Sequence, residues 1–253
     1  MEVPCLKHDF TNIIVGKNAV LEALKSGHAA DSLYVASIQG SNTASSIFKE
    51  CKRRGIPIKK TDARKLDEIS GGAVHQGVVL TIPEVEYSTL DDIFELSKQR
   101  EEIPLIVICD GIEDPHNLGA IIRSAESAGA HGIIIPKRRS VSLNHTVAKA
   151  ACGALEYIPV CRVTNITSAI DELKSRGIWV YAADMGGRAV YEEDMRGPTA
   201  LVIGSEGEGI SRLVKEHCDV TVSIPMAGKI GSLNASVAAG IILFEIKRQR
   251  DMA

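Results

Sequence analysis

Short apolar runs alternate along the chain with longer segments in which apolar residues recur every three or four positions. Such runs are typical of β-strands and such periodic segments of α-helices, so the alternation predicts an α/β protein. The alternation is interrupted once, at the polar stretch PEVEYS of residues 83–88. We therefore expect two domains, residues 1–82 and residues 89–253, joined by a linker at residues 83–88.

The first domain is expected to be a small α/β unit. Its predicted strands cover residues 12–15, 32–36, 57–60 and 77–82, and its predicted helices cover residues 19–24, 43–54 and 63–69. Gly27 and Gly55 follow two of these helices at the position where a glycine commonly ends a helix. A unit of this size is small but able to fold alone.

The second domain is larger and more regular. Its predicted strands cover residues 105–109, 132–135, 157–160, 178–182, 200–203 and 220–224, and its predicted helices cover residues 89–98, 117–128, 146–151, 166–175, 211–216 and 236–247. These strands are continuous apolar runs, which are typical of parallel strands buried on both faces. The pattern predicts an open parallel sheet with helices on both sides, which binds its ligands beyond the carboxyl ends of the strands.

The first unusual loop at such an end leads into residues 110–130, DGIEDPHNLGAIIRSAESAGA. Asn117 can cap the helix that follows. Arg123 is expected one turn beyond Gly119, near the mouth of the site. Two interpretations of Arg123 stay open from this segment alone, a solvated surface side chain or a contact to an anion such as phosphate.

The second unusual loop, in LVIGSEGEGIS at residues 201–211, runs from a strand into glycines that allow a close approach to a ligand. Its order is GxxGxG, whereas a dinucleotide site has GxGxxG in its first βα turn. The loop also contains Glu206 and Glu208, which would repel a pyrophosphate. A nicotinamide-dependent oxidoreductase is therefore disfavoured, and the chain has no phosphate-binding P-loop sequence.

The third loop precedes the last helix and is rich in glycine and small polar residues. Asn234 can cap that helix, but capping does not require the serines on either side of it. Backbone amides near Ile224, Met226 and Leu233 could bind the edge of a flat base. The three loops together could hold a cofactor that contains adenosine.

These loops resemble the three motifs of the SpoU/TrmH class of SPOUT methyltransferases, which transfer methyl from S-adenosylmethionine to a ribose 2′-hydroxyl of RNA. The matching segments are residues 117–125, residues 203–209, and residues 224–226 with 232–238. VGKNAVLEAL and AVHQGVV near the N-terminus are similar to the L30e-like substrate-binding domain of the two-domain members. Among those members the resemblance is strongest to the 23S rRNA guanosine 2′-O-methyltransferases, which implies a guanosine of 23S rRNA as the target. Members that act on tRNA commonly lack the N-terminal domain, which also favours rRNA.

The resemblance also implies a site, a knot and a homodimer. The chain end would pass through a deep trefoil knot, and the site would lie near the subunit interface. The residues that would bind S-adenosylmethionine are Gly204, Ile224, Met226, Ser232 and Leu233. The residues that would serve catalysis are Asn117, Arg123, Glu206, Asn234 and Ser236.

The transfer itself is an in-line displacement that needs alignment and a destination for the hydroxyl proton, but no metal. The family assigns the base to the arginine that matches Arg123. Since a guanidinium stays protonated in proteins, a clamp on the target phosphate is the second interpretation of Arg123. Glu206, Asn234 and Ser236 would then position Arg123 and the nucleotide, and Asn117 would hold the loop or contact the ribose.

The net charge of −3 does not indicate a nucleic-acid partner, but its distribution is uneven. Residues 1–80 carry 11 Lys and Arg against 8 Asp and Glu, and the rest of the chain carries 18 against 24. Basic residues also follow the predicted strand at residues 132–135, as Lys137, Arg138 and Arg139. The side chains expected to contact RNA phosphates in the first domain are Lys52, Arg53, Arg54, Lys59 and Lys60, with His75 and Gln76 as weaker candidates.

No apolar run is long enough for a membrane span and no secretory signal is present, so we expect a cytoplasmic protein. The six cysteines have no metal-site spacing and are expected to be reduced thiols. Two alternatives to the 23S rRNA enzyme stay open. One is a 2′-O-methyltransferase acting on tRNA or on an rRNA adenosine, and the other is a non-enzymatic RNA-binding factor with the same fold.

Overall fold

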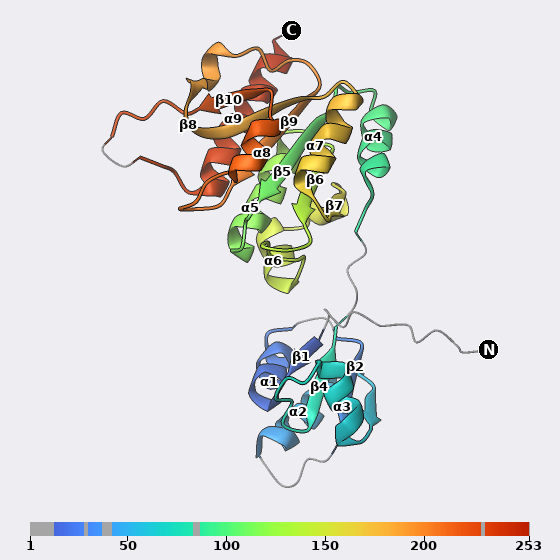
Figure 1. Ribbon diagram of the computed structural model, residues 1–253. Helices are drawn as coiled ribbons and strands as arrows, with labels where there is room; N and C mark the ends of the chain where they lie inside the picture. The colour runs from blue at the N-terminus through green and yellow to red at the C-terminus, as the bar shows by residue number, and fades with distance from the viewer. Residues whose placement is uncertain (1–12, 28–29, 37–41, 83–86, 229–230, 253) are drawn as a thin grey trace, which may run out of the picture. The chain divides into compact units, whose positions relative to one another are not determined.

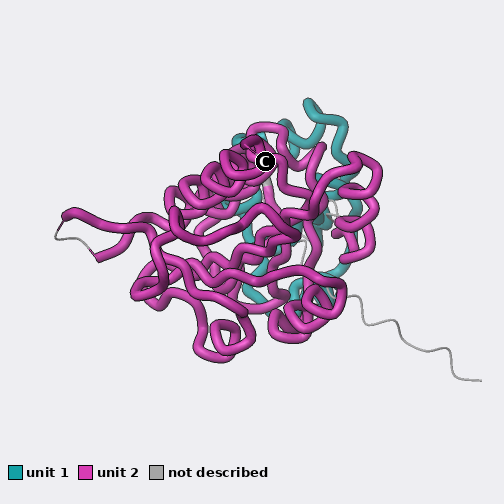
Figure 2. Tube along the Cα trace, turned by 90° about the horizontal axis from the view of Figure 1, so that it is seen from above, with its two compact units in different colours: residues 1–85 teal, residues 86–253 magenta. Residues whose placement is uncertain are grey.

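The computed structural model describes residues 13–27, 30–36, 42–82, 87–228 and 231–252. The chain forms two compact units, unit 1 with residues 1–85 and unit 2 with residues 86–253 (Figure 2). Residues 83–86 of the expected linker lie outside the described residues. Ser88, also expected in the linker, belongs to unit 2 and forms a bridge with Cys161.

Unit 1 contains a four-stranded sheet with the order β1 (Ile13–Val15), β4 (Val78–Thr81), β2 (Ser32–Val35) and β3 (Ile58–Lys60). β4 is antiparallel to both of its neighbours, and β3 is parallel to β2. Helices α1 (Lys17–Lys25) and α2 (Asn42–Arg53) cover one face, and α3 (Ala63–Ser70) covers the other. Side chains alternate along β4, so that Val78 and Leu80 pack with α1 and α2 whereas Val79 packs with α3.

Unit 2 contains the predicted parallel sheet. Its six strands have the order β10 (Val220–Ser223), β8 (Trp179–Ala189), β9 (Thr199–Gly204), β5 (Leu105–Asp110), β6 (Gly132–Pro136) and β7 (Val160–Val163), as Figure 1 shows. Every neighbouring pair is parallel. The central strands are buried at consecutive positions, which explains their continuous apolar sequences.

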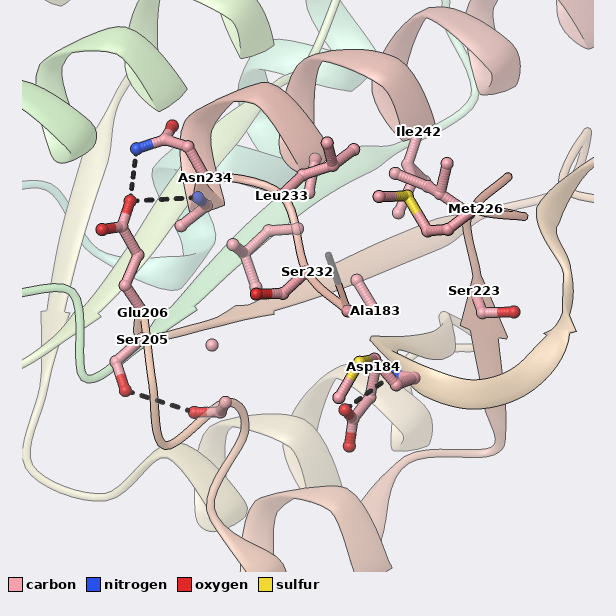
Figure 3. Close-up of a pocket in the computed structure, with 18 of the residues that line it drawn as sticks. Ala183, Asp184, Ser205, Glu206, Ser223, Met226, Ser232, Leu233, Asn234 and Ile242 are labelled. Atoms are coloured by element: carbon pink, nitrogen blue, oxygen red, sulfur yellow. Dashed lines mark hydrogen bonds between the residues drawn. The ribbon is translucent and has the colours of Figure 1, made fainter. Parts of the chain in front are cut away.

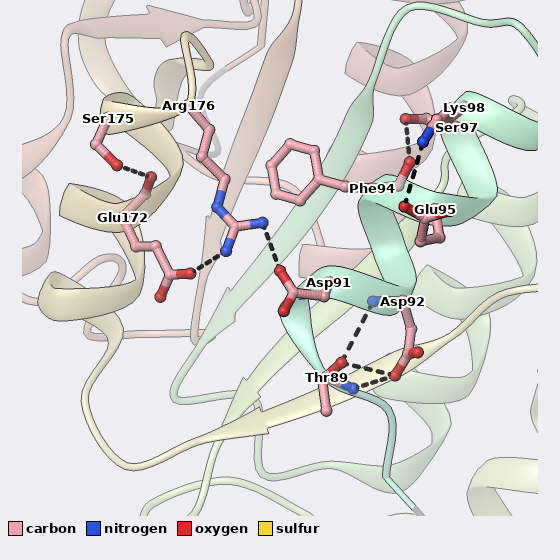
Figure 4. Close-up of polar contacts among 10 residues, drawn as sticks. All are labelled: Thr89, Asp91, Asp92, Phe94, Glu95, Ser97, Lys98, Glu172, Ser175 and Arg176. Carbon is pink, nitrogen blue, oxygen red and sulfur yellow. Dashed lines mark hydrogen bonds and ion pairs between the residues drawn. The ribbon is translucent and has the colours of Figure 1, made fainter.

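Helices cover both faces of this sheet. On one face α4 (Leu90–Gln99), α7 (Ile166–Ser175) and α8 (Arg212–His217) share a core with the strands through Ile93, Ile170 and Val214. Arg176, directly after α7, pairs with Asp91 of α4 at 2.7 Å and lies 4.7 Å from the ring centre of Phe94. Figure 4 shows these side chains between the two helices. Of the remaining helices, α6 (His145–Ala151) and α9 (Ala235–Asp251) both pack against α5 (Pro115–Ser127).

The predicted strand at residues 157–160 is wrong in its bounds. Residues Ala154–Glu156 form a 3-10 helix, Tyr157 is exposed, and β7 begins only at Val160. Pro159 explains the late start, since it has no N–H to donate to a ladder. A second 3-10 helix, Val190–Glu192, follows β8. The knot stays a prediction.

Candidate functional site

The site begins at the start of α5, and here one prediction was wrong. Asp114 caps α5, because its Oδ1 accepts a hydrogen bond from the His116 N–H at 3.1 Å, and Pro115 takes the first helical position. Asn117 therefore lies inside the helix and does not cap it. Its side chain is buried and free to contact the two other loops.

Asn117, Glu206 and Asn234 form one hydrogen-bonded network, although they lie in three separate motifs. The Asn117 Nδ2 group donates to Glu206 Oε1 at 3.0 Å, and Asn234 Nδ2 donates to Asn117 Oδ1 at 2.9 Å. Asn234 Nδ2 also donates to Glu206 Oε1 (Figure 3). Because Glu206 lies at the N-terminus of α9, the helix dipole favours its negative charge.

Asn234 caps α9, as predicted. Its Oδ1 accepts from the backbone N–H groups of Ser236 and Val237 at 3.0 and 3.2 Å. The hydroxyl of Ser236 donates to the same oxygen at 2.6 Å. Both ends of the Asn234 amide are thus occupied by its neighbours, and the residue fixes the third loop against the first two.

A cavity of about 690 Å³ opens beside this network. Five residues expected to bind the cofactor line it: Gly204, Ile224, Met226, Ser232 and Leu233. Glu206 and Asn234 also line it (Figure 3). Asn117 and Ser236 adjoin it through their hydrogen bonds to these two residues. The volume is in the range of pockets for small molecules and cofactors.

A fourth segment of the cavity was missed by sequence reasoning. β8 extends past the predicted end at residue 182, but its pairing with β10 jumps from Ala182 opposite Thr221 to Arg188 opposite Val222. The intervening residues leave the pairing with β10, although Ala183 still pairs with Ile203 of β9, and Ala183 to Gly186 line the cavity. The signal was present, since an Asp and two glycines directly follow an apolar run at the carboxyl end of a strand.

The lining combines apolar walls with negative charge. Apolar side chains include Ile203, Val222 and Ile242, and carboxylates come from Asp184, Glu206 and Glu208. Asp184 is paired with Lys215 at 2.5 Å, whereas the two glutamates form no ion pair with another described residue. Such a lining suits a ligand with a flat apolar ring and a positive centre, and opposes a pyrophosphate.

Close packing explains the glycine at position 204. A Cβ atom there would lie 2.2 Å from the backbone carbon of Gly209, because the loop folds back on itself. Ser205 and Gly209 exchange backbone hydrogen bonds of 3.1 and 3.0 Å that hold this fold. The loop can therefore bring its backbone to the cavity wall only with glycine at this position.

Arg123 lies apart from the network. It is exposed on α5, and its Nη1 donates to the Cys152 sulfur at 3.4 Å. In the part of the chain that the structure describes, it forms no hydrogen bond or ion pair with Glu206, Asn234 or Ser236. The structure of one chain therefore does not join Arg123 to the residues that were expected to position it.

The candidate RNA contacts of unit 1 are partly engaged within that unit. His75 Nδ1 accepts from the Gly77 N–H at 3.0 Å, and Gln76 Oε1 accepts from the Lys17 N–H at the start of α1. Arg53 pairs with Glu50, Arg54 donates to the Leu24 carbonyl at 2.9 Å, and Lys59 donates to the Tyr34 hydroxyl at 3.3 Å. Lys52 and Lys60 are exposed. Their role in RNA binding stays a prediction.

Two further properties concern the described residues as a whole. None of their helices combines the length and the apolar character that crossing a membrane requires. The same residues include no group of three or more His, Cys, Asp and Glu placed to hold a metal ion.

Comparison with protein families now adds to the geometry. The model of the SpoU rRNA Methylase family matches residues 104–244, which contain all three motifs of the site. The chain belongs to the SpoU rRNA methylase family. A second model, for RNA 2′-O ribose methyltransferase substrate binding, matches residues 13–88, so both units of the chain are those of SpoU-type methyltransferases.

Curated relatives agree with this assignment. The chain is 48% identical over 246 residues to the Bacillus subtilis protein named "Putative TrmH family tRNA/rRNA methyltransferase YacO", and the match covers 97% of both chains. A Staphylococcus haemolyticus protein of the same family name is 44% identical, over 94% of this chain and 96% of its own. These names leave open which RNA is modified.

Solved structures of SpoU methyltransferases share the fold. The AviRb enzyme of Streptomyces viridochromogenes, crystallised with the cofactor AdoMet, is 29% identical with a TM-score of 0.60 over 94% of this chain and 90% of its own. An AdoMet-bound rRNA methyltransferase of Sinorhizobium meliloti is 26% identical, with a TM-score of 0.57 over 94% and 87%. A TrmH/SpoU tRNA modifying enzyme of A. aeolicus, 30% identical with a TM-score of 0.54, covers 64% of this chain and 86% of its own.

Proposed function

We propose that this chain transfers a methyl group from S-adenosylmethionine to the 2′-hydroxyl of a guanosine ribose in 23S rRNA. Membership of the SpoU family makes the chain an RNA methyltransferase, and the finer target is our proposal. One observation carries it: the network of Asn117, Glu206 and Asn234 joins the three family motifs at the rim of a cavity lined by all five expected cofactor residues.

The residues of the cavity fit the cofactor. Apolar side chains such as Ile203 and Ile242 can enclose an adenine ring, and the backbone groups of Gly204, Ile224 and Leu233 are available to its polar edge. Carboxylates of Glu206 and Glu208 favour a positive charge nearby. When bound, S-adenosylmethionine would supply a methyl group carried by a positively charged sulfonium, with the neutral thioether of S-adenosylhomocysteine as the leaving group.

The network gives this site its geometry. An in-line displacement loses most of its rate when the reacting groups are misplaced by about 1 Å, so loops that form it must be fixed relative to one another. Glu206 and Asn234 do this by hydrogen bonds between the second and third motifs, and Asn117 extends the bonds to the first. Ser236 completes the positioning through Asn234.

Arg123 has the role of a phosphate clamp in this proposal. It lies on α5, the helix that also carries Asn117, and its guanidinium is exposed to solvent. A guanidinium binds phosphate with two parallel hydrogen bonds and cannot act as a base without losing its proton. Arg123 thus orients the target nucleotide, and the hydroxyl proton leaves by another path.

An rRNA target is supported by the extent of the similarities. The rRNA methyltransferase of Sinorhizobium meliloti matches 94% of this chain, both units included, whereas the A. aeolicus tRNA modifying enzyme matches 64%. The share of this chain outside the second match, about 36%, is close to the size of unit 1, which has 85 of the 253 residues. Methylation of tRNA, or of an rRNA adenosine, is the competing function.

The test is transfer of labelled methyl to unmodified 23S rRNA, 16S rRNA and tRNA, with Arg123→Ala and Arg196→Ala measured alongside. Arg196 is an exposed arginine paired with Asp194 and serves as the matched control. We expect label at one guanosine of 23S rRNA, with resistance to alkaline cleavage there, lost only in Arg123→Ala. Label in tRNA alone would replace the substrate, and failure to bind S-adenosylmethionine would contradict the function.

A further inference from the structure

The positive side chains of unit 2 differ in whether a neighbour engages them. Most of its arginines form an ion pair or a hydrogen bond through the guanidinium, as Arg212 does with Glu216 and Arg176 with Asp91 (Figure 4). Among the described residues of unit 2, two arginines form no ion pair and no hydrogen bond through the guanidinium, Arg138 and Arg139. Two lysines of the same part of the chain form none through the ammonium group, Lys137 and Lys149. All four lie in one segment, residues 137–149.

The sequence around these four cations provides no acidic side chain to pair with them. Residues 127–155 contain no Asp or Glu, although 32 of the 253 residues of the chain are acidic. The adjoining loop before α5 carries two carboxylates, Glu113 and Asp114, and the second is used as the cap of α5. The segment therefore presents an excess of positive charge on a chain whose overall charge is negative.

This basic segment lies beside the candidate site. It follows β6, which pairs in parallel with β5, so its loop is at the same edge of the sheet as the site. The Val141 N–H and the Ser140 hydroxyl donate to the Ile112 carbonyl at 2.9 and 3.2 Å. A Cβ atom on Gly111 would lie 3.5 Å from the Ser205 side chain and 4.0 Å from the Arg139 carbonyl, so Gly111 lies between the basic loop and the loop of Glu206.

The backbone of the basic loop is fixed while its side chains are free. Lys137 donates its N–H to the Val163 carbonyl at 2.8 Å, and its own carbonyl accepts a hydrogen bond from Arg162 at 3.2 Å. Arg139 has a φ of +56°, in the left-handed region that a non-glycine residue rarely adopts. A glycine would adopt this conformation without strain, whereas the arginine strains the backbone at this position.

We propose that Lys137, Arg138, Arg139 and Lys149 form a phosphate-binding surface that holds the RNA strand flanking the target nucleotide. The inference rests on the proposed function, because it takes RNA as the partner. Contacts to phosphate position a nucleic acid without reading its sequence, and the forked guanidinium matches a phosphate in shape and charge. A loop with a fixed backbone and unpaired cations beside the site provides such contacts.

The experiment compares two variants with equal loss of charge. The test variant is Lys137→Ala/Arg138→Ala/Arg139→Ala, and the control is Lys98→Ala/Arg196→Ala/Arg212→Ala, whose exposed cations are all ion-paired in unit 2. The measurement is the affinity of each full-length variant for a 23S rRNA transcript, with S-adenosylhomocysteine present, over a range of KCl concentrations. At about 0.7 released counterions per contact, the test variant should lose about 2 from the slope of log affinity against log salt, and bind on the order of tenfold to a hundredfold more weakly near 150 mM.

Two further variants exclude a folding defect. Arg139→Gly relieves the backbone strain while it removes one charge, so it should melt no lower than the parent and yet bind RNA more weakly. Arg138→Lys/Arg139→Lys should keep most of the salt slope, because the charges remain. An unchanged salt slope and affinity in the triple variant, or equal losses in the control, would overturn the proposal. Neither outcome would contradict the proposed function, which depends on S-adenosylmethionine binding and methyl transfer. Absence of cofactor binding in the parent chain would instead contradict the proposed function.

Discussion

At the scale of single residues, Glu206 holds the three motifs together through one carboxylate oxygen. Its Oε1 accepts hydrogen bonds from the Asn117 and Asn234 side chains and from the Ala235 N–H. A bond to a charged acceptor is about twice as strong as a neutral one. Glu206→Gln should therefore weaken the hydrogen bonds that join the three loops, while the size of the side chain stays nearly the same.

We expect kcat/KM for methyl transfer to fall by about tenfold to a hundredfold in Glu206→Gln, since small misplacements in a transfer site have effects of that order. The control is Glu208→Gln, which removes the same charge from the same loop. Glu208 makes no hydrogen bond to another described residue, so its replacement should act only through charge. Equal losses in both variants would show that the hydrogen bonds of Glu206 do not matter.

His131, at the edge of the sheet opposite the candidate site, makes the free energy of unfolding depend on pH. Its ring is fully buried, its Nδ1 accepts from the Leu105 N–H at 3.1 Å, and its Nε2 lies 3.0 Å from Glu102 Oε2. Burial lowers the pKa of His131 from the ordinary 6.5, and the neighbouring Glu102 opposes this shift only in part. Between the lowered pKa of the folded chain and the ordinary pKa of the unfolded chain, only the unfolded chain binds a proton at His131.

The free energy of unfolding should accordingly be highest above pH 6.5 and should decrease as the pH falls below that value towards the lowered pKa of His131. His131→Gln cannot titrate in this range, and it should lose less stability than the parent between neutral and mildly acidic pH. Urea unfolding of both chains at a series of pH values measures the difference. Parallel curves for the two chains would contradict the prediction.

At the scale of elements, the contact between α5 and α6 depends on a glycine. A Cβ atom on Gly119 would lie 2.4 Å from the Ala150 Cβ and 2.7 Å from the Val147 carbonyl oxygen. Gly119→Ala should force the helices apart and lower the free energy of unfolding by about 1–3 kcal/mol, as overpacking does in general. Denaturant unfolding measures this as a lower midpoint with an unchanged slope.

Gly197→Ala is the matched control for this substitution. A Cβ atom on Gly197 would meet no heavy atom within 4 Å, and the residue does not have a positive φ. The same chemical change should therefore leave stability within about 0.5 kcal/mol of the parent. If the two substitutions have the same effect, packing at Gly119 is not what determines the position of α6.

The elements also show what the sequence could predict. The continuous apolar runs predicted the parallel sheet, and the helix at residues 166–175 has its predicted bounds, because burial on both faces and a 3.6-residue period leave clear patterns. The start of α5 was predicted late, since both Asp114 and Asn117 can cap a helix and only the fold places Asn117 against Glu206. The interruption of the pairing between β8 and β10 at residues 183–187 was missed, because it depends on β10, a strand more than 30 residues away.

At the scale of the whole molecule, the motifs predicted their own convergence but not the place of Arg123. Asn117 and Asn234 are 117 residues apart and yet lie 2.9 Å from each other, as the resemblance implied. Arg123 is exposed and forms no bond to them within the described residues. Its use in the site would be explained by a second chain, which periodicity along one sequence cannot place.

The proposed homodimer gives this explanation a surface. Val237 and Phe244 of α9 are 50% and 49% exposed, and a spacing of seven residues places them on one face of that helix. α9 packs against α5, the helix of Arg123. We expect Val237→Glu/Phe244→Glu to convert a dimer to a monomer in sedimentation analysis, whereas Met252→Glu, an equally apolar exposed position at the end of α9, should not.

If Arg123 acts across the interface, two variants with impaired methyl transfer should complement each other. In a dimer of Arg123→Ala with Glu206→Gln, one site would carry both substitutions and the other would carry neither. Random mixing after separate purification should then restore about a quarter of the parent's methyl transfer, because half of the dimers are mixed and each has one intact site. If Arg123 serves the site of its own chain, every site in the mixture contains one substitution, and mixing should restore nothing. Mixtures made with the monomeric Val237→Glu/Phe244→Glu background provide the control, since they should fail to complement in either case.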